Sequence, residues 1–235
     1  FGQWQNIEKD DEFRLLMRRM LSAFDTGIDD ISFEEREREE LSESDIPDRV
    51  LEDIELNGPE ETVMVSGPSY SSYLVDKTAD GLRIRELCTK HDTEQGAVTF
   101  RIVEESDGTK RLTDLIPLFA SIGPTDKTFV VDEIDRSLHP DLTYRLFDLF
   151  LHRHAQNKSQ LVATTHDVGL LNLDLLRRDE IWFVEKDAGE ASTLYSLQEY
   201  KPRKDLNIQK AYLHGRYGAV PLVRNSEFLE TVTER

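Results

Sequence analysis

The chain has 235 residues, a formal net charge of −18 and a single cysteine, Cys88. Hydrophobic residues make up 38% of the chain and charged residues 32%, which is typical of a soluble globular protein. No apolar run approaches the roughly 20 residues that cross a bilayer, and the sequence shows no secretory signal pattern. One cysteine excludes an internal disulfide and a CxxC metal site. We therefore expect a cytoplasmic protein without a membrane partner.

The negative charge is concentrated in residues 1–60, which hold nineteen acidic residues against seven basic ones, a net charge of −12. Within this part, Glu34 to Glu40 reads EEREREE, which predicts a solvated helix face or a flexible arm. A docking surface for a basic partner is the alternative. Such a charge balance argues against a direct grip on a phosphate backbone, so binding of nucleic acid stays open only for other regions.

The first predicted helix covers residues 11–24, where apolar residues recur at helical spacing: Phe13, Leu16, Met17, Met20, Leu21 and Phe24. The run Asp25-Thr26-Gly27 predicts its end, and residues 28–33 predict an extended piece. From residue 36 to residue 81 the sequence is acidic, polar and interrupted by Pro and Gly. We expect an inserted or poorly regular subdomain there.

The following part predicts an α/β fold. Residues 82–90 and 97–104 flank a turn and predict an antiparallel hairpin. Residues 128–131, 142–150 and 161–165 then read as strand, helix and strand, the pattern of a parallel βαβ core. A second hairpin is predicted at 181–184 and 193–197, and a short helix at 206–213 before a turn at Gly215 and Gly218. We expect a helical and acidic insert or arm at 1–81, an α/β lobe at 82–200 and a helical tail at 201–235.

Charged residues follow both strands of the predicted βαβ core. Asp132 and Glu133 come directly after the first strand, and His166 comes after the second, in LVATTHD. Because the strands are parallel, these residues are expected at one edge of the sheet, where ligands bind in open α/β folds. A strand followed by Asp-Glu is the Walker B pattern, in which the Asp serves Mg²⁺ and the Glu is the general base. Structural acids at a strand end and a two-metal nuclease centre are the alternatives, although no second acidic cluster follows a strand.

A second candidate site lies upstream, in ESDGTKRL at Glu105 to Leu112. Ser106, Asp107 and Gly108 place a hydroxyl, backbone N–H groups and a predicted helix N-terminus in one corner, which is typical of an anion site. An ordinary serine N-cap with glycine in the turn is the alternative. Ser137 and His139 lie between the acidic pair and the second strand. This is the place of the loop that crosses a dimer interface after a Walker B strand.

These residues resemble the ABC-type ATPase superfamily, whose signature motif is matched by ESDGT at Glu105–Thr109. Within it, SDGTKRL, VVDEIDRSLHP, TTHD, LLRRDEIWFVEKD and RKDLNIQKAYLHGRYGAVP are similar to prokaryotic AAA ATPases with an SMC-like head, of the abortive-infection RloA or AbiL type. The resemblance covers residues 100–222 well and residues 11–33 weakly. It implies an ABC-ATPase-like P-loop NTPase fold with ATP and Mg²⁺. Its implied site residues are the Mg²⁺ residue Asp132, the base Glu133, the γ-phosphate sensor His166 and the nucleotide-binding residues Ser106, Asp107, Gly108, Ser137 and His139.

The resemblance also implies a head-to-tail homodimer or higher oligomer, in which Ser106 and Gly108 bind the γ-phosphate of a nucleotide held by the partner. For the family it implies antiphage defence or abortive infection with an effector such as a nuclease. The largest departure from the family is that the sequence contains no GxxxxGK[ST], and Pro117 inside the signature helix is a smaller one. We therefore expect a C-terminal portion of a longer ATPase, inactive by itself. The alternatives are an SMC-like DNA-maintenance ATPase head and an ATP-gated interaction module that does not hydrolyse ATP.

Overall fold

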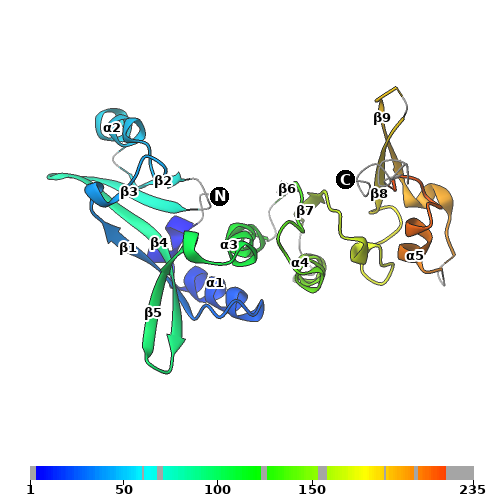
Figure 1. The fold of residues 1–235 in the computed structure, drawn as a ribbon, viewed down its shortest axis with the longest axis horizontal. Helices are drawn as coiled ribbons and strands as arrows, with labels where there is room; N and C mark the ends of the chain where they lie inside the picture. The colour runs from blue at the N-terminus through cyan, green and yellow to red at the C-terminus, as the bar shows by residue number, and fades with distance from the viewer. Residues whose placement is uncertain are drawn as a thin grey trace, which may run out of the picture. The chain divides into compact units, whose positions relative to one another are not determined.

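An antiparallel sheet of five strands dominates the N-terminal part of the computed structural model, which describes residues 4–59, 61–67, 71–122, 126–152, 158–187, 189–203 and 206–220. The strands are β1 (Asp30–Arg36), β2 (Val63–Ser66), β3 (Ser72–Thr78), β4 (Gly81–Thr93) and β5 (Gly96–Arg101). Their order is β1-β4-β3-β2, and β5 pairs with the C-terminal half of β4 (Figure 1). The hairpin predicted around residues 91–96 is confirmed as β4–β5.

Helices cover both faces of this sheet. Helix α1 (Asp11–Ala23) begins at its N-cap Asp10, whose carboxylate accepts hydrogen bonds from the Glu12 and Phe13 amides at 3.0 Å. Its apolar stripe packs with the sheet and with α3 (Asp107–Ala120) in the larger core. Helix α2 (Asp48–Asn57) packs on the opposite face in a smaller core (Figure 1). The first predicted helix and the strand that follows it are confirmed.

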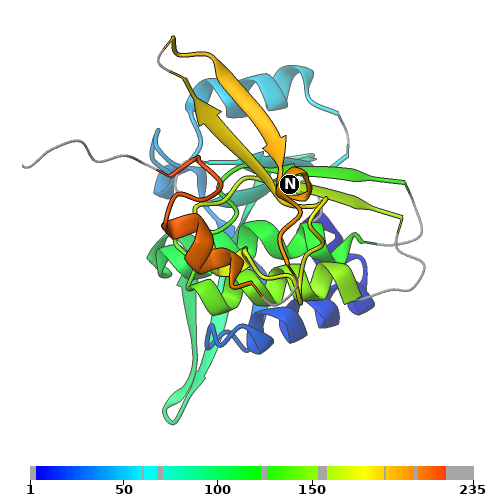
Figure 2. The same cartoon turned by 90° about the vertical axis from the view of Figure 1, so that its right-hand side faces the viewer.

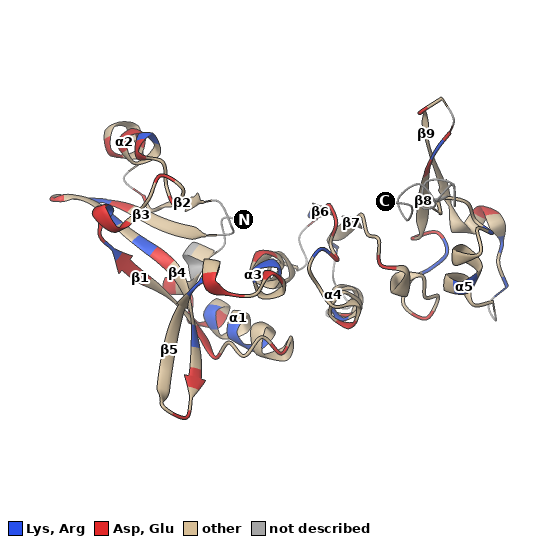
Figure 3. Cartoon of the chain, viewed as in Figure 1, with Lys and Arg blue, Asp and Glu red and all other residues tan. Residues whose placement is uncertain are grey.

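The acidic segment is more regular than the sequence predicts. Glu34 to Arg36 lie in β1 and pair with β4, and Arg38–Glu40 form a 3-10 helix, η2, so the expectation of a helix face or flexible arm at Glu34–Glu40 is wrong. Residues 36–81 also supply α2, β2 and β3, so they are not an irregular subdomain. The charges within β1 are paired across strands, as in Glu34 with Lys90 at 3.1 Å, whereas Glu37, Glu39 and Glu40 are exposed. Figure 3 shows acidic and basic positions close together across β1 and β4.

The predicted parallel unit follows. Strands β6 (Thr128–Val131) and β7 (Gln160–Ala163) pair in parallel, with helix α4 (Pro140–His152) between them in the chain. Helices α1, α3 and α4 contribute to one core, and Figure 2 shows them from the side. The rings of Phe119 and Phe150 meet edge to face, with centroids 6.5 Å apart, and join α3 to α4. The parallel βαβ core is therefore confirmed.

The chain folds into two compact units, residues 1–165 and 166–235, whereas the sequence predicts three regions with boundaries after 81 and 200. In the second unit, β8 (Trp182–Lys186) and β9 (Ser192–Ser196) form the predicted hairpin, and α5 (Ile208–Leu213) is the predicted short helix. Phe183 stacks on Tyr212 and Tyr217 at 5.5 and 5.8 Å. Both glycines of the predicted turn, Gly215 and Gly218, have positive φ. Residues 221–235 of the predicted tail lie outside the described residues.

Short 3-10 helices complete the fold: η1 (Trp4–Glu8), η2 (Arg38–Glu40), η4 (Ile102–Glu104), η5 (Val168–Leu170) and η6 (Leu197–Tyr200). Over the described ranges, no helix combines the length and the apolar character needed to cross a bilayer.

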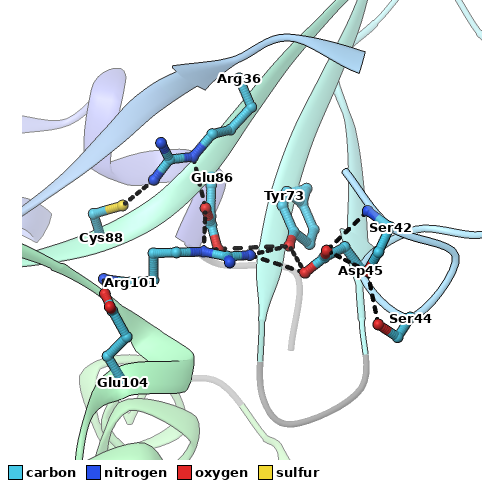
Figure 4. A network of polar contacts seen from close by, with 9 residues as sticks. All are labelled: Arg36, Ser42, Ser44, Asp45, Tyr73, Glu86, Cys88, Arg101 and Glu104. Carbon is cyan, nitrogen blue, oxygen red and sulfur yellow. Dashed lines mark hydrogen bonds and ion pairs between the residues drawn. The ribbon is translucent and has the colours of Figure 1, made fainter. Parts of the chain in front are cut away.

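A buried ion-pair network holds β1, β3, β4 and the end of β5 together (Figure 4). The carboxylate of Glu86, only 1% exposed, accepts hydrogen bonds from the guanidinium groups of Arg36 and Arg101, both at 2.8 Å. Arg101 also donates to Asp45 at 2.8 Å, and the Tyr73 hydroxyl donates to the same oxygen at 3.0 Å. Burial alone would raise the pKa of Asp45, but its hydrogen bonds outweigh burial and lower the pKa to about 2.

Replacing Glu86 with Ala is expected to lower the free energy of unfolding by about 3 kcal/mol, because two arginines would lose their buried counter-ion. The partial exposure of Arg36 and Arg101 places this value at the low end of the range for broken buried pairs. Glu35→Ala is the matched control, since Glu35 pairs with Arg83 on the surface and such pairs contribute about 1 kcal/mol or less. Urea unfolding followed by circular dichroism measures both; equal losses would contradict a special role for Glu86.

Candidate functional site

The acidic pair Asp132 and Glu133 lies directly after β6, with both residues exposed. The next residue, Ile134, is fully buried in the core and anchors the turn. Glu133 adopts a left-handed backbone conformation with φ +45°, which costs a residue other than glycine about 1 kcal/mol. Its carbonyl accepts a hydrogen bond from the Arg136 amide at 3.1 Å, which closes the turn. Surrounding contacts must therefore hold Glu133 in this conformation.

Thr164, directly after β7, supplies several of these contacts. Its hydroxyl accepts a hydrogen bond from the Glu133 amide at 2.8 Å and donates one to Oδ1 of Asp132. Its carbonyl accepts from the Ile134 amide, and its own amide donates to the Val131 carbonyl, both at 3.0 Å. Thr164 thus orients both acids from the neighbouring strand. The sequence offers one signal for this role, which is the place of Thr164 between the second strand and His166.

The three residues predicted to belong to a signature motif, Ser106 to Gly108, form the start of α3 and are called the signature corner. The Ser106 hydroxyl caps the helix by accepting from the Thr109 amide at 3.1 Å, and it lies 2.9 Å from the Thr109 hydroxyl. Asp107 is the first residue of the helix, and its side chain is 81% exposed. The geometry is that of a serine N-cap, which leaves the positive end of a 14-residue helix at this corner. An N-cap and an anion site are therefore compatible here.

The residue before this corner ties it to the large sheet. The carboxylate of Glu105 accepts a hydrogen bond from the Thr89 hydroxyl and lies 2.7 Å from Nε2 of His91. Both partners belong to β4, so the start of α3 has a fixed attachment to the antiparallel sheet.

The signature corner lies against the loop that carries Ser137. A Cβ atom built on Gly108 would stand 3.0 Å from the Ser137 carbonyl oxygen, so only glycine fits there without displacement. Ser137 is itself left-handed, with φ +61°. His139, further along the loop, accepts a hydrogen bond at Nδ1 from the Asp141 amide at 3.2 Å, and its side chain is 70% exposed.

Arg111 joins the signature helix to the acidic pair. Its Nη2 atom donates hydrogen bonds to the carbonyl oxygens of Asp132 at 3.0 Å and Glu133 at 2.8 Å. The first unit thus brings the signature corner, the Ser137 loop and the acidic pair to neighbouring positions around α3. His166 is the first residue of the second unit and follows Thr164 by two positions in the chain. In the sequence, the signal for Arg111 is its place within SDGTKRL.

The exposed carboxylate of Asp132 fits a magnesium ion. Mg²⁺ is usually bound by one or two carboxylates together with water and substrate phosphates, rather than by a cage of protein ligands. The described part of the chain contains no group of three or more His, Cys, Asp or Glu residues placed to hold a metal. The residues that would hold Mg²⁺ here are Asp132 and, through its hydrogen bond to that carboxylate, Thr164.

The architecture defines a P-loop NTPase-like α/β fold, in which a parallel strand ends in an Asp-Glu pair beside a capped helix. Residues 5–172 match the family model described as "AAA domain, putative AbiEii toxin, Type IV TA system". The chain therefore belongs to this family of AAA-type ATPase domains. Membership of the narrower RloA or AbiL type stays a prediction.

Solved structures of SMC heads are also similar to the chain. One, from work on the ATP-driven dimerisation and DNA-stimulated activation of SMC ATPases, is 20% identical with a TM-score of 0.35, covering 72% of this chain and 84% of that one. Another, an SmcHead bound to the C-winged helix domain of ScpA, is 20% identical with a TM-score of 0.44. It covers 85% of this chain, which spans about half (48%) of that structure's length. No curated protein matches the chain.

Proposed function

We propose that the chain is the signature and Walker B part of an ABC-type ATPase that hydrolyses ATP with Mg²⁺ between two copies arranged head to tail. Glu133 is the general base for the attacking water, and Asp132 serves Mg²⁺. Ser106 and Gly108, with Asp107 beside them, face the γ-phosphate of the nucleotide held by the partner copy. Ser137 and His139 lie on the loop at the seam, and His166 senses the γ-phosphate.

The observation that carries this proposal is the conformation of Glu133. Its backbone is left-handed, and hydrogen bonds hold it from the neighbouring strand through Thr164 and from the signature helix through Arg111. A general base acts efficiently when its carboxylate is held in place before the substrate arrives. An acid with a purely structural role at a strand end does not need a left-handed backbone, nor the contacts that hold Glu133 in that conformation.

Asp132 would hold Mg²⁺, which when bound would neutralise charge at the phosphates. The capped N-terminus of α3 adds a positive field and backbone N–H groups near the signature corner. These donors would stabilise the charge that develops on the γ-phosphate oxygens during transfer.

A P-loop must come from outside these 235 residues, because they contain no GxxxxGK[ST]. We therefore propose that the 235-residue chain does not hydrolyse ATP alone. The activity experiments below use the protein in which this chain is joined to its P-loop, called here the P-loop-bearing protein.

For the biological role we propose antiphage defence by abortive infection in the cytoplasm, with an effector such as a nuclease as the partner. The family description, which names a putative AbiEii toxin and a type IV toxin–antitoxin system, supports this role. A cell carrying the Glu133→Gln protein should lose protection against phage if ATP turnover drives the response.

Two measurements on the wild-type P-loop-bearing protein test the ATPase proposal: phosphate release, and molar mass by light scattering with and without ATP. We expect phosphate release that requires Mg²⁺, together with an ATP-dependent doubling of mass. The isolated 235-residue chain is the control and should release no phosphate. Mass doubling without phosphate release would instead support an ATP-gated module that does not hydrolyse ATP. The absence of both phosphate release and mass doubling would reject the proposed head-to-tail ATPase.

A further inference from the structure

Arg111 lies on α3 and contacts the backbone of the acidic pair. Its side chain is only 12% exposed. Its Nη2 atom donates to two successive carbonyl oxygens, those of Asp132 and Glu133, at 3.0 and 2.8 Å. Hydrogen bonds from a charged donor are stronger than those between neutral groups, so this contact constrains the backbone of both acids.

One part of this arrangement costs stability. The Nε atom of Arg111 is buried and has no hydrogen-bond partner within the described part of the chain, which carries a desolvation cost. Among the described residues, the carboxylate paired with the guanidinium is that of Asp114, at 3.5 Å on the next turn of the helix. An apolar side chain of similar size would fill the same space without leaving a buried donor unpaired.

The same helix face also reaches the Ser137 loop. Gly108 and Arg111 are three residues apart on α3 and therefore lie on one face of the helix. Gly108 approaches the Ser137 carbonyl, and Arg111 holds the carbonyls of the acidic pair. A small shift of the first turn of α3 would thus act on the loop and on the acids together.

We propose that Arg111 is a positioning residue that couples the signature corner to the orientation of Glu133. Contact of the corner with a triphosphate held by the partner copy sets the position of α3. Because Arg111 on α3 hydrogen-bonds the backbone of the general base, the position of α3 also sets the position of that backbone. Displacement of α3 would therefore also displace the backbone of the general base. This inference rests on the proposed ATPase function.

The test compares three variants of the P-loop-bearing protein. Arg111→Met removes every donor while keeping the length of the side chain, and Arg111→Lys keeps one charged donor. Asp114→Asn is the matched control, because it breaks the ion pair and leaves both carbonyl contacts in place. We expect Arg111→Met to lower kcat about 100-fold, as small misplacements of catalytic groups do, with the KM for ATP unchanged. Arg111→Lys should recover part of the loss, and Asp114→Asn should stay near wild type.

Hydrogen exchange on the 235-residue chain gives a second readout that needs no activity. Arg111→Met should speed exchange at the Arg136 amide, which bonds the Glu133 carbonyl, while amides in β3 and β4 keep their protection. Faster exchange throughout the chain, a raised KM or an Asp114→Asn defect equal to that of Arg111→Met would overturn the inference. Wild-type hydrolysis with no change in any Arg111 variant rejects the inference alone. A wild-type protein without hydrolysis rejects the proposed function as well.

Discussion

Replacing Glu133 with Gln is expected to reduce ATP turnover by the P-loop-bearing protein about 1,000-fold, within the range for loss of a general base. Gln has nearly the same shape as Glu but cannot take a proton from water. The contacts that hold residue 133 use its backbone amide and carbonyl, so they survive the change. Nucleotide affinity should therefore stay at the wild-type level.

The expected signature of this variant is a trapped complex. Since binding is retained and hydrolysis is slow, the ATP-bound dimer should accumulate and be visible by light scattering in the presence of ATP and Mg²⁺. Glu40→Gln is the matched control, because it makes the same chemical change at an exposed position in η2. Normal turnover by the Glu133→Gln protein would remove this residue as the base and leave the acidic pair with a structural role.

Ser106→Arg is expected to abolish turnover to a similar degree by a different route. The large, extended side chain would fill the signature corner, so the partner's nucleotide could not approach the start of α3. Loss of the N-cap hydrogen bond to Thr109 should cost only about 1 kcal/mol of stability, which leaves the protein folded. ATP binding by the same subunit should persist, because the corner is proposed to contact the other subunit's nucleotide.

A mixing experiment distinguishes this arrangement from a corner that serves its own subunit. In a mixed dimer of Ser106→Arg and Glu133→Gln protomers, one interface combines the intact Glu133 of the first protomer with the intact Ser106 of the second. Two proteins that are inactive separately should then regain activity on mixing, up to half of the wild-type rate per dimer. Ser106→Asn, which retains a good N-cap residue, controls for the helix start. No recovery on mixing would show that the corner acts within its own subunit or not at all.

Local sequence patterns predict many of the helices and strands. The apolar spacing of α1, the turn between β4 and β5 and the strand–helix–strand pattern of β6, α4 and β7 depend on neighbouring residues, and the structure confirms all three. The acidic pair was found for the same reason, since it directly follows a strand. Its alignment depends on Thr164 and Arg111, which lie about 30 and 20 positions away in the chain. The residues next to the acidic pair in the sequence do not predict those contacts.

The acidic segment shows the opposite case. The sequence predicts a solvated helix face or a flexible arm at Glu34 to Glu40, because such a run of charges is usually solvated. In the fold, cross-strand partners pair with the charges that lie within β1, and Arg36 meets the buried Glu86 from 50 positions away. Glu37, Glu39 and Glu40, beyond the strand, remain exposed. Pairing between distant residues made a β-strand favourable where local composition did not.

The sequence by itself therefore determined the class of the fold, most of the helices and strands and the candidate residues, because these depend on spacing and on chemistry between near neighbours. Only the tertiary structure decided which distant groups hold the site in place: Thr164 and Arg111 around Glu133, the Ser137 loop against Gly108, and β4 behind Glu105. The physical reason is that a strained or charged group is stable only where partners surround it, and those partners are brought together by folding.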